Sequence, residues 1–219
     1  MSTQQRGAAL RFLVLSGSGR AGSLNTRLAA LAAETLSGQG RPATTATVSD
    51  FAVPGYDGDV EASQGVPKGA ERFREELERV DGLVVAAPEY NASMPGTVKN
   101  LIDWTSRFHP QPFNALHTLL MSASPSMSGG NRGLWALRVP LEHLGARVYP
   151  DMFSLAQAHT AFAPGGGLGD PVLQRRFGTT LDDFGSLAEA AKHYPCAKKA
   201  WVEYLGEHPD AATDRTQTG

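Results

Sequence analysis

Four polar residues crowd a short stretch that follows the first apolar run of the chain. Residues 17–25 read GSGRAGSLN, in which Ser18, Arg20, Ser23 and Asn25 are spaced by glycine, alanine and leucine. Hydroxyl and amide groups donate hydrogen bonds to anions, and a guanidinium grips a phosphate through two parallel bonds. A helix is predicted to begin here, so its free N–H groups and its dipole would add to the attraction. The pattern predicts a site for one terminal phosphate group.

The same stretch has other interpretations. Gly17, Gly19 and Gly22 satisfy G-x-G-x-x-G, the spacing of Rossmann dinucleotide-binding units, but the acidic residue expected about 20 residues later is absent. The nearest acidic residue that ends a strand is Asp50, 28 positions after Gly22. A Walker A sequence requires Lys where Ser23 stands, which excludes a triphosphate-hydrolysing P-loop. An ordinary surface turn with a helix cap stays open as the third alternative.

A second polar stretch follows the apolar run at residues 83–87. Residues 88–104 read PEYNASMPGTVKNLIDW. The residues directly after the run are Pro88, Glu89, Tyr90 and Asn91. Pro88 ends the strand because it has no N–H for a β-ladder, and Pro95 suits the start of a helix. A strand, a polar loop and a helix form half of a βαβ unit, so we interpret this stretch as a ligand loop.

Apolar runs and helical periodicities alternate along the chain. Strands are predicted at 11–16, 43–49, 83–87, 117–123 and 147–155, the last one interrupted by Pro150. Helices are predicted from Ser23 to Gly38, around Phe73 and Leu77, from Pro95, from Leu134 to Leu144, and in one or two pieces from Pro171. Pro140 should kink or divide the fourth of these helices. Residues 50–68 and 163–169 are predicted to be loops.

This alternation predicts an α/β fold with a parallel sheet and helices on both faces. Right-handed crossovers and five strands favour the flavodoxin-like three-layer sandwich, with strand order 2-1-3-4-5. We expect a disordered leader at 1–10, one domain at 11–207 and a polar tail at 208–219.

Composition excludes several classes of protein. The 219 residues are 41% hydrophobic and 19% charged, with a net charge of −2, which gives no electrostatic case for nucleic acid or an anionic membrane as partner. The single Cys196 excludes an intrachain disulfide, and the six histidines show no spacing typical of a metal site. No apolar run is long enough for a secretory or membrane-spanning segment. We therefore expect a cytoplasmic protein without a metal.

Taken together, these stretches resemble the NADPH-dependent FMN reductase family, the flavodoxin-like quinone, azo and chromate reductases. The resemblance is carried by Gly17-Ser18, Arg20, Gly22-Ser23 and Asn25, by PEYNASMPGTVKNLIDW, and by a third segment from Ser122-Ala123-Ser124 through Gly129-Gly130-Asn131-Arg132 to Leu144-Gly145-Ala146. It covers residues 11–153 and extends faintly to the helix around 181–205. The sequence departs from many relatives at Ala92, where they carry a larger residue.

The resemblance implies an FMN across the carboxyl ends of the first, third and fourth strands. Its phosphate would be held by Ser18, Arg20, Ser23 and Asn25, its ring lined by Pro88, Glu89, Tyr90 and Asn91, and the other side bordered by Ala123 and Ser124. No side chain need act as a catalytic nucleophile or base, because the flavin accepts hydride from NADPH or NADH.

The resemblance also implies ping-pong transfer to a quinone or similar small acceptor, in a homodimer or homotetramer. A flavodoxin-like electron carrier, a flavin reductase that supplies a partner monooxygenase, and a flavin-free NAD(P)-binding Rossmann protein are the alternatives.

Overall fold

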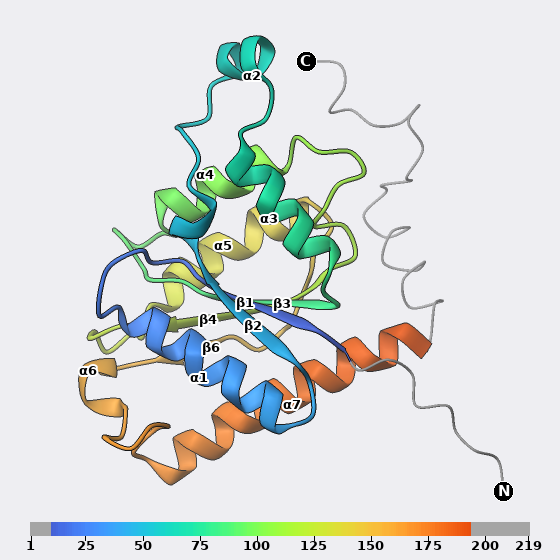
Figure 1. Ribbon diagram of the computed structural model, residues 1–219. Coiled ribbons are helices and arrows are strands. Elements are labelled where there is room, and N and C mark those ends of the chain that lie inside the picture. Colours follow the sequence, from blue (N-terminus) through green and yellow to red (C-terminus); the bar gives the residue numbers. More distant parts are fainter. Residues whose placement is uncertain (1–9, 194–219) are drawn as a thin grey trace, which may run out of the picture.

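The computed structural model describes residues 10–193, which form a twisted sheet covered by helices on both faces (Figure 1). The elements in chain order are β1 (Phe12–Ser16), α1 (Leu24–Gly38), β2 (Ala43–Thr47), the 3₁₀ turn η1 (Val48–Phe51), α2 (Gly58–Gln64), α3 (Lys68–Glu78), β3 (Gly82–Ala86), α4 (Gly96–Thr105), β4 (His117–Ala123), α5 (Asn131–His143), β5 (Arg147–Val148), β6 (Phe153–Leu155), α6 (Ala158–Ala161) and α7 (Pro171–His193). Helices α1, α6 and α7 cover one face, and α3, α4 and α5 cover the other.

The sheet is parallel and has the order β2-β1-β3-β4-β5, which confirms the predicted flavodoxin-like arrangement. The predicted fifth strand is in fact two short strands, β5 and β6, and both pair with β4. Pro150 lies between them, and its missing N–H explains why one continuous ladder cannot form there.

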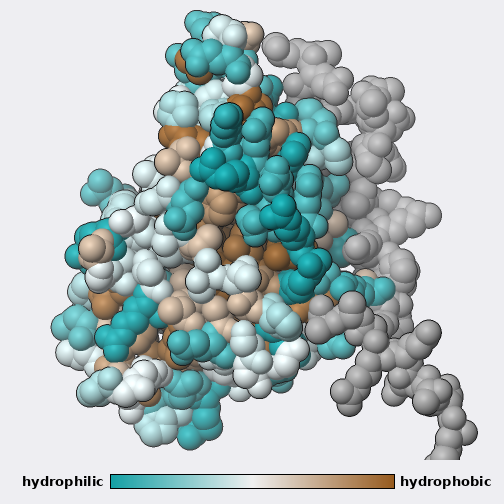
Figure 2. All heavy atoms as spheres, in the orientation of Figure 1, coloured by the Kyte–Doolittle hydropathy of each residue, from teal (hydrophilic) through white to brown (hydrophobic). Residues whose placement is uncertain are grey.

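Alternate residues of the central strands face opposite helical layers. In β1, Phe12 and Val14 pack toward α1 and α7, whereas Leu13 and Leu15 pack toward α3, α4 and α5. Both sets are buried, which is why this strand reads as a continuous apolar run. The outer side of α3 is charged, and Figure 2 shows a hydrophilic surface over this helix, as its Glu- and Arg-rich face predicts.

Pro140 was predicted to kink or divide α5. The structure has one continuous helix there, so the division is excluded and the kink stays a prediction. One further prediction differs from the structure. Residues 50–68 are not a loop, because they contain the end of η1 and the helix α2, on an arm that projects from the body (Figure 1). Helix α2 buries none of its residues, so it has no apolar periodicity that a sequence pattern could reveal.

Contacts with α4 and the residues just after it hold the projecting arm in place. The Tyr56 hydroxyl donates to Glu61 Oε2 at 2.8 Å, and Arg107 Nε donates to Glu61 Oε1 at 2.9 Å. The Tyr56 ring meets the Trp104 ring edge to face, with centroids 4.9 Å apart, and the Trp104 indole donates to the carbonyl of Pro54. Trp104 is fully buried, so it also packs in the core.

We predict that acid loosens this arm. The hydrogen bond from Arg107 lowers the pKa of Glu61 below its ordinary value, against the opposing effect of burial and with help from Tyr56. The unfolded-state pKa is higher, about 4.3, so the arm adds stability above that pH and loses it as pH falls through the lower folded-state value. In urea unfolding, Glu61→Gln should be less stable than the parent chain at pH 7, with a smaller difference below about pH 4. A difference of equal size at both pH values would contradict this account.

Several predictions lie outside the described residues: the leader up to residue 9, Cys196, the polar tail, and the far end of the helix expected to reach 205. Helix α7 is a single helix as far as His193. Among the described helices, none is both long and apolar enough to cross a bilayer.

Candidate functional site

The loops after β1, β3 and β4 meet at the carboxyl edge of the sheet. The Gly17 N–H donates to the carbonyl of Ala86 at 2.8 Å, and the Ala87 N–H donates to that of Met121 at 2.9 Å. A β-carbon on Gly17 would lie 2.9 Å from a methyl of Val98 and 3.0 Å from that of Ala87, so only glycine allows this approach. Ligands of doubly wound folds bind at this edge, which agrees with the site expected from the sequence.

The hydroxyls of the loop after β1 accept hydrogen bonds from the backbone of the loop and of the helix that follows. Ser23 caps α1, since its Oγ accepts from the N–H groups of Asn25 and Thr26 at 3.2 and 3.4 Å. Ser18 Oγ accepts from the Arg20 N–H at 3.4 Å. Each hydroxyl therefore keeps its own hydrogen available for a ligand.

Further donors of this loop bond no other group within residues 10–193. They are the backbone N–H groups of Gly19, Ala21 and Gly22, and the exposed guanidinium of Arg20. They lie just before the N-terminus of α1, where the helix dipole also favours negative charge. These donors could together hold an anion, and we name residues 18–23 the anion cradle.

Asn25 makes different contacts from those expected. Its Nδ2 donates to the carbonyl of Ala123 and its Oδ1 accepts from the Ala123 N–H, both at 2.9 Å, and the residue is buried. The amide thus joins the start of α1 to the end of β4. The Nδ2 group carries a second N–H, so the predicted contact between Asn25 and a phosphate stays a prediction.

The loop after β3 is a tight two-residue hairpin. Tyr90 and Ser93 exchange backbone hydrogen bonds of 2.9 and 3.0 Å, and the residues between them, Asn91 and Ala92, both have positive φ, +50° and +61°. Two positive φ angles are typical of a type I′ turn. The turn leaves the Tyr90 side chain exposed beyond the strand end, and Asn91 suits its conformation whereas Ala92 does not.

We predict that Ala92→Gly stabilises the chain by about 1 kcal/mol, because glycine adopts the left-handed conformation without the steric cost of a β-carbon. Urea unfolding of the cofactor-free protein measures this gain. Ala92→Val should lose stability, since a β-branched residue is disfavoured at positive φ. Equal stability of the glycine and valine variants would show that the turn is not strained.

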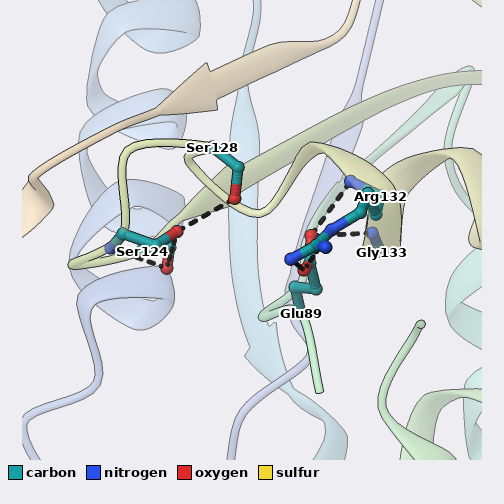
Figure 3. Close-up of polar contacts among 6 residues, drawn as sticks. Glu89, Ser124, Ser128, Arg132 and Gly133 are labelled. Atoms are coloured by element: carbon teal, nitrogen blue, oxygen red, sulfur yellow. Dashed lines mark hydrogen bonds and ion pairs between the residues drawn. The ribbon is translucent and has the colours of Figure 1, made fainter. Parts of the chain in front are cut away.

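The Glu89 side chain also bonds to a distant part of the protein. Its carboxylate turns toward the start of α5, as Figure 3 shows. Oε2 accepts from the backbone N–H groups of Arg132 and Gly133 at 3.0 and 3.2 Å, and Oε1 accepts from Arg132 Nε at 2.9 Å. Burial tends to raise the pKa of Glu89, but the hydrogen bonds from Arg132 and Gly133 outweigh it, and the pKa lies below its ordinary value. The carboxylate is therefore bound within the protein, and the expected place of Glu89 beside a flavin ring stays a prediction.

The loop after β4 carries a row of hydrogen-bonded serine hydroxyls. Ser124 Oγ lies 3.0 Å from Ser126 Oγ, which lies 3.0 Å from Ser128 Oγ (Figure 3). The Ser124 carbonyl accepts from the Ala158 N–H at the start of α6. Ala123, directly before this loop, is bonded to Asn25 of α1, which places the start of the serine loop near the loop after β1.

Sequence reasoning missed other residues of this site. Thr26 Oγ1 lies 2.9 Å from Ser16 Oγ and holds the loop after β1, and Arg132 pairs with Glu89. The glycine pair at 129–130, just before Asn131, was a signal for a helix start. Nothing local, however, indicated a partner 43 residues away.

A hollow of about 220 Å³ lies at the opposite, amino-terminal edge of the sheet. Its wall includes Leu77, His117 and the ion pair between Asp81 and Lys192. None of the three loops reaches it. The strand-end loops, with their free donors, therefore form the better supported site.

Comparison with known proteins agrees with this geometry. The chain is 35% identical over 139 residues to a quinone reductase of Escherichia coli (strain K12), covering 64% of this chain and 73% of that protein. It is 36% identical over 164 residues to an NAD(P)H-dependent FMN reductase of Pseudomonas aeruginosa, covering 74% and 85%. The structure is similar to that of FerB, a flavoenzyme NAD(P)H:(acceptor) oxidoreductase from Paracoccus denitrificans, with a TM-score of 0.72 and 25% identity, covering 83% of this chain and 98% of that chain. Residues 10–160 match the family model described as NADPH-dependent FMN reductase, and the chain therefore belongs to this family.

Proposed function

We propose that this chain is an FMN-dependent NAD(P)H oxidoreductase that passes hydride from NAD(P)H to FMN and then to a quinone or similar small acceptor. The observation that carries the proposal is the anion cradle after β1, which stands beside the loops that follow β3 and β4. The quinone reductase of E. coli and the FMN reductase of P. aeruginosa support the two halves of the reaction.

The donor set of the cradle fits a phosphate monoester. Such a group presents several anionic oxygens, and the cradle offers the Arg20 fork, the Ser18 and Ser23 hydroxyls and three free backbone N–H groups. A bridging pyrophosphate has fewer anionic oxygens per phosphorus. The terminal phosphate of FMN therefore matches the cradle better than the pyrophosphate of a dinucleotide.

The remaining loops would hold the flavin ring. Pro88, Tyr90 and Asn91 would line it on one side, and Ala123 and Ser124 would border the other. When bound, FMN supplies hydride acceptance from NAD(P)H and hydride delivery to the acceptor. The protein places the reactants and excludes water, and no side chain of the loops is required as nucleophile or base.

A direct test is anaerobic titration of the purified chain. We expect a yellow protein whose flavin absorbance bleaches on adding NADPH or NADH and returns on adding a quinone. A colourless protein that fails to retain added FMN would refute the proposal. Bleaching only after a separate reductase is added would indicate an electron carrier, and release of reduced flavin into solution would indicate a flavin reductase.

We further propose that the chain assembles as a homodimer or homotetramer through the outer face of α5. Trp135 and Val139 lie one turn apart on this helix, 56% and 69% exposed. Two large apolar side chains so placed favour association with a second apolar surface. Trp135→Glu combined with Val139→Glu should reduce the mass measured by light scattering to that of one chain, and an unchanged mass would contradict this assembly.

We also propose that the enzyme acts in the cytoplasm, where NAD(P)H is available.

A further inference from the structure

The first turn of α5 lacks a cap of its own. The residue at the N-cap position is Gly130, which has a left-handed backbone and no side chain to accept the free N–H groups of the helix. The carboxylate of Glu89 takes over this task from a distant loop and accepts two of those N–H groups. A negative charge there also interacts favourably with the helix dipole.

The backbones of the same two segments are also in close contact. A β-carbon on Gly133 would lie 3.0 Å from Glu89 Cα, 3.1 Å from Glu89 Cβ and 3.1 Å from the carbonyl oxygen of Ser93. The helix start therefore rests directly on the hairpin after β3. This steric fit is independent of the hydrogen bonds and indicates the same pairing of segments.

We propose that Glu89 is a positioning residue whose carboxylate joins the hairpin at 88–95, the start of α5 and the serine loop at 124–130 into one unit. The two sides of the flavin-ring site then have their relative positions before the cofactor arrives. The proposal rests on the proposed function, because it concerns the same site. It adds a residue that acts through α5 and not by touching the ring.

The cap and the ion pair contribute unequally to this unit. The Arg132 side chain is 65% exposed and that of Glu89 only 9%. Exposed ion pairs contribute little, whereas a carboxylate that accepts backbone N–H groups away from water contributes more. Loss of the carboxylate should therefore matter more than loss of the guanidinium.

The test compares Glu89→Ala, Glu89→Gln and Arg132→Ala with the parent full-length chain, and uses Glu142→Gln as the matched control. Glu142 pairs with Arg138 within α5 at 2.7 Å and does not touch the hairpin. The Kd for FMN should rise about tenfold or more for Glu89→Ala. It should rise less than about threefold for Glu89→Gln, whose amide oxygen still caps the helix, and for Arg132→Ala, which keeps the Glu89 carboxylate. The visible circular dichroism of bound FMN should change in Glu89→Ala alone.

Amide hydrogen exchange of the chain without FMN tests the unit separately from cofactor binding. Glu89→Ala should lose protection at 88–95 and 131–134 together, while α1 and α7 stay protected. A Kd and an exchange pattern equal to those of the parent would overturn the proposal. Should the parent chain itself fail to bind FMN, the proposed function falls and the exchange result alone decides the role of Glu89.

A second variant guards against a Glu89→Ala chain that does not fold. Gly133→Ala keeps the carboxylate but forces the helix start away from the hairpin. It should also raise the Kd for FMN and alter the flavin dichroism. Unchanged values in Gly133→Ala would overturn the proposal as well.

Discussion

Arg20→Ala should weaken the binding of FMN by about 1.5–3 kcal/mol, the contribution of hydrogen bonds to a charged group. This loss corresponds to a Kd raised by about 10- to 150-fold. The guanidinium is exposed and has no hydrogen bond or ion pair within residues 10–193, so its removal leaves no buried partner behind. The free energy of unfolding of the cofactor-free chain should therefore stay unchanged. Quenching of flavin fluorescence on binding measures the Kd.

Two companion variants sharpen this test. Arg175→Ala removes an exposed arginine from α7 and should leave the Kd as it is, which controls for net charge. Arg20→Lys should restore part of the affinity, because lysine keeps the charge and loses the bidentate fork. If Arg20→Ala binds FMN as tightly as the parent chain, the cradle does not hold the phosphate.

Asn25→Ala should lower the free energy of unfolding by about 2–4 kcal/mol, even without FMN. The substitution leaves the N–H and the carbonyl of Ala123 unpaired in a buried place, and each unsatisfied group costs about 1–3 kcal/mol. Without the two hydrogen bonds between Asn25 and Ala123, the anion cradle should move relative to β4, and FMN binding should weaken as a consequence. Urea unfolding of the cofactor-free chain gives the first value directly.

This experiment separates the structural role of Asn25 from the role expected from the sequence. A residue that only bound the phosphate would change the Kd and leave the stability of the cofactor-free chain intact. Asn131→Ala removes an exposed amide from the first position of α5 and serves as the control, with little expected loss of stability. A loss below about 0.5 kcal/mol for Asn25→Ala would show that water replaces the two hydrogen bonds.

Much of the fold follows from local sequence patterns. The apolar runs predicted β1, β3 and β4 within a residue of their bounds, because central strands of a parallel sheet are buried on both faces. Strand order followed from the handedness of crossover connections. Helix α2 was missed because Arg107 holds its Glu61 and Trp104 packs against Tyr56 just before it, and those partners lie more than 40 residues away along the chain.

Local sequence patterns predicted which loops lie at the candidate site. Glycine, proline, serine and arginine at strand ends reveal a turn, a helix start and free donors, since each of these effects is local. Tertiary structure alone decided which polar atoms remain available for a ligand. Asn25 and Glu89, which the sequence predicts to contact the cofactor, also have hydrogen-bond partners 98 and 43 residues away, on elements that only folding brings near. The chemistry of a side chain follows from its type, whereas the hydrogen-bond donors and acceptors that it has left for a ligand depend on the neighbours that the fold supplies.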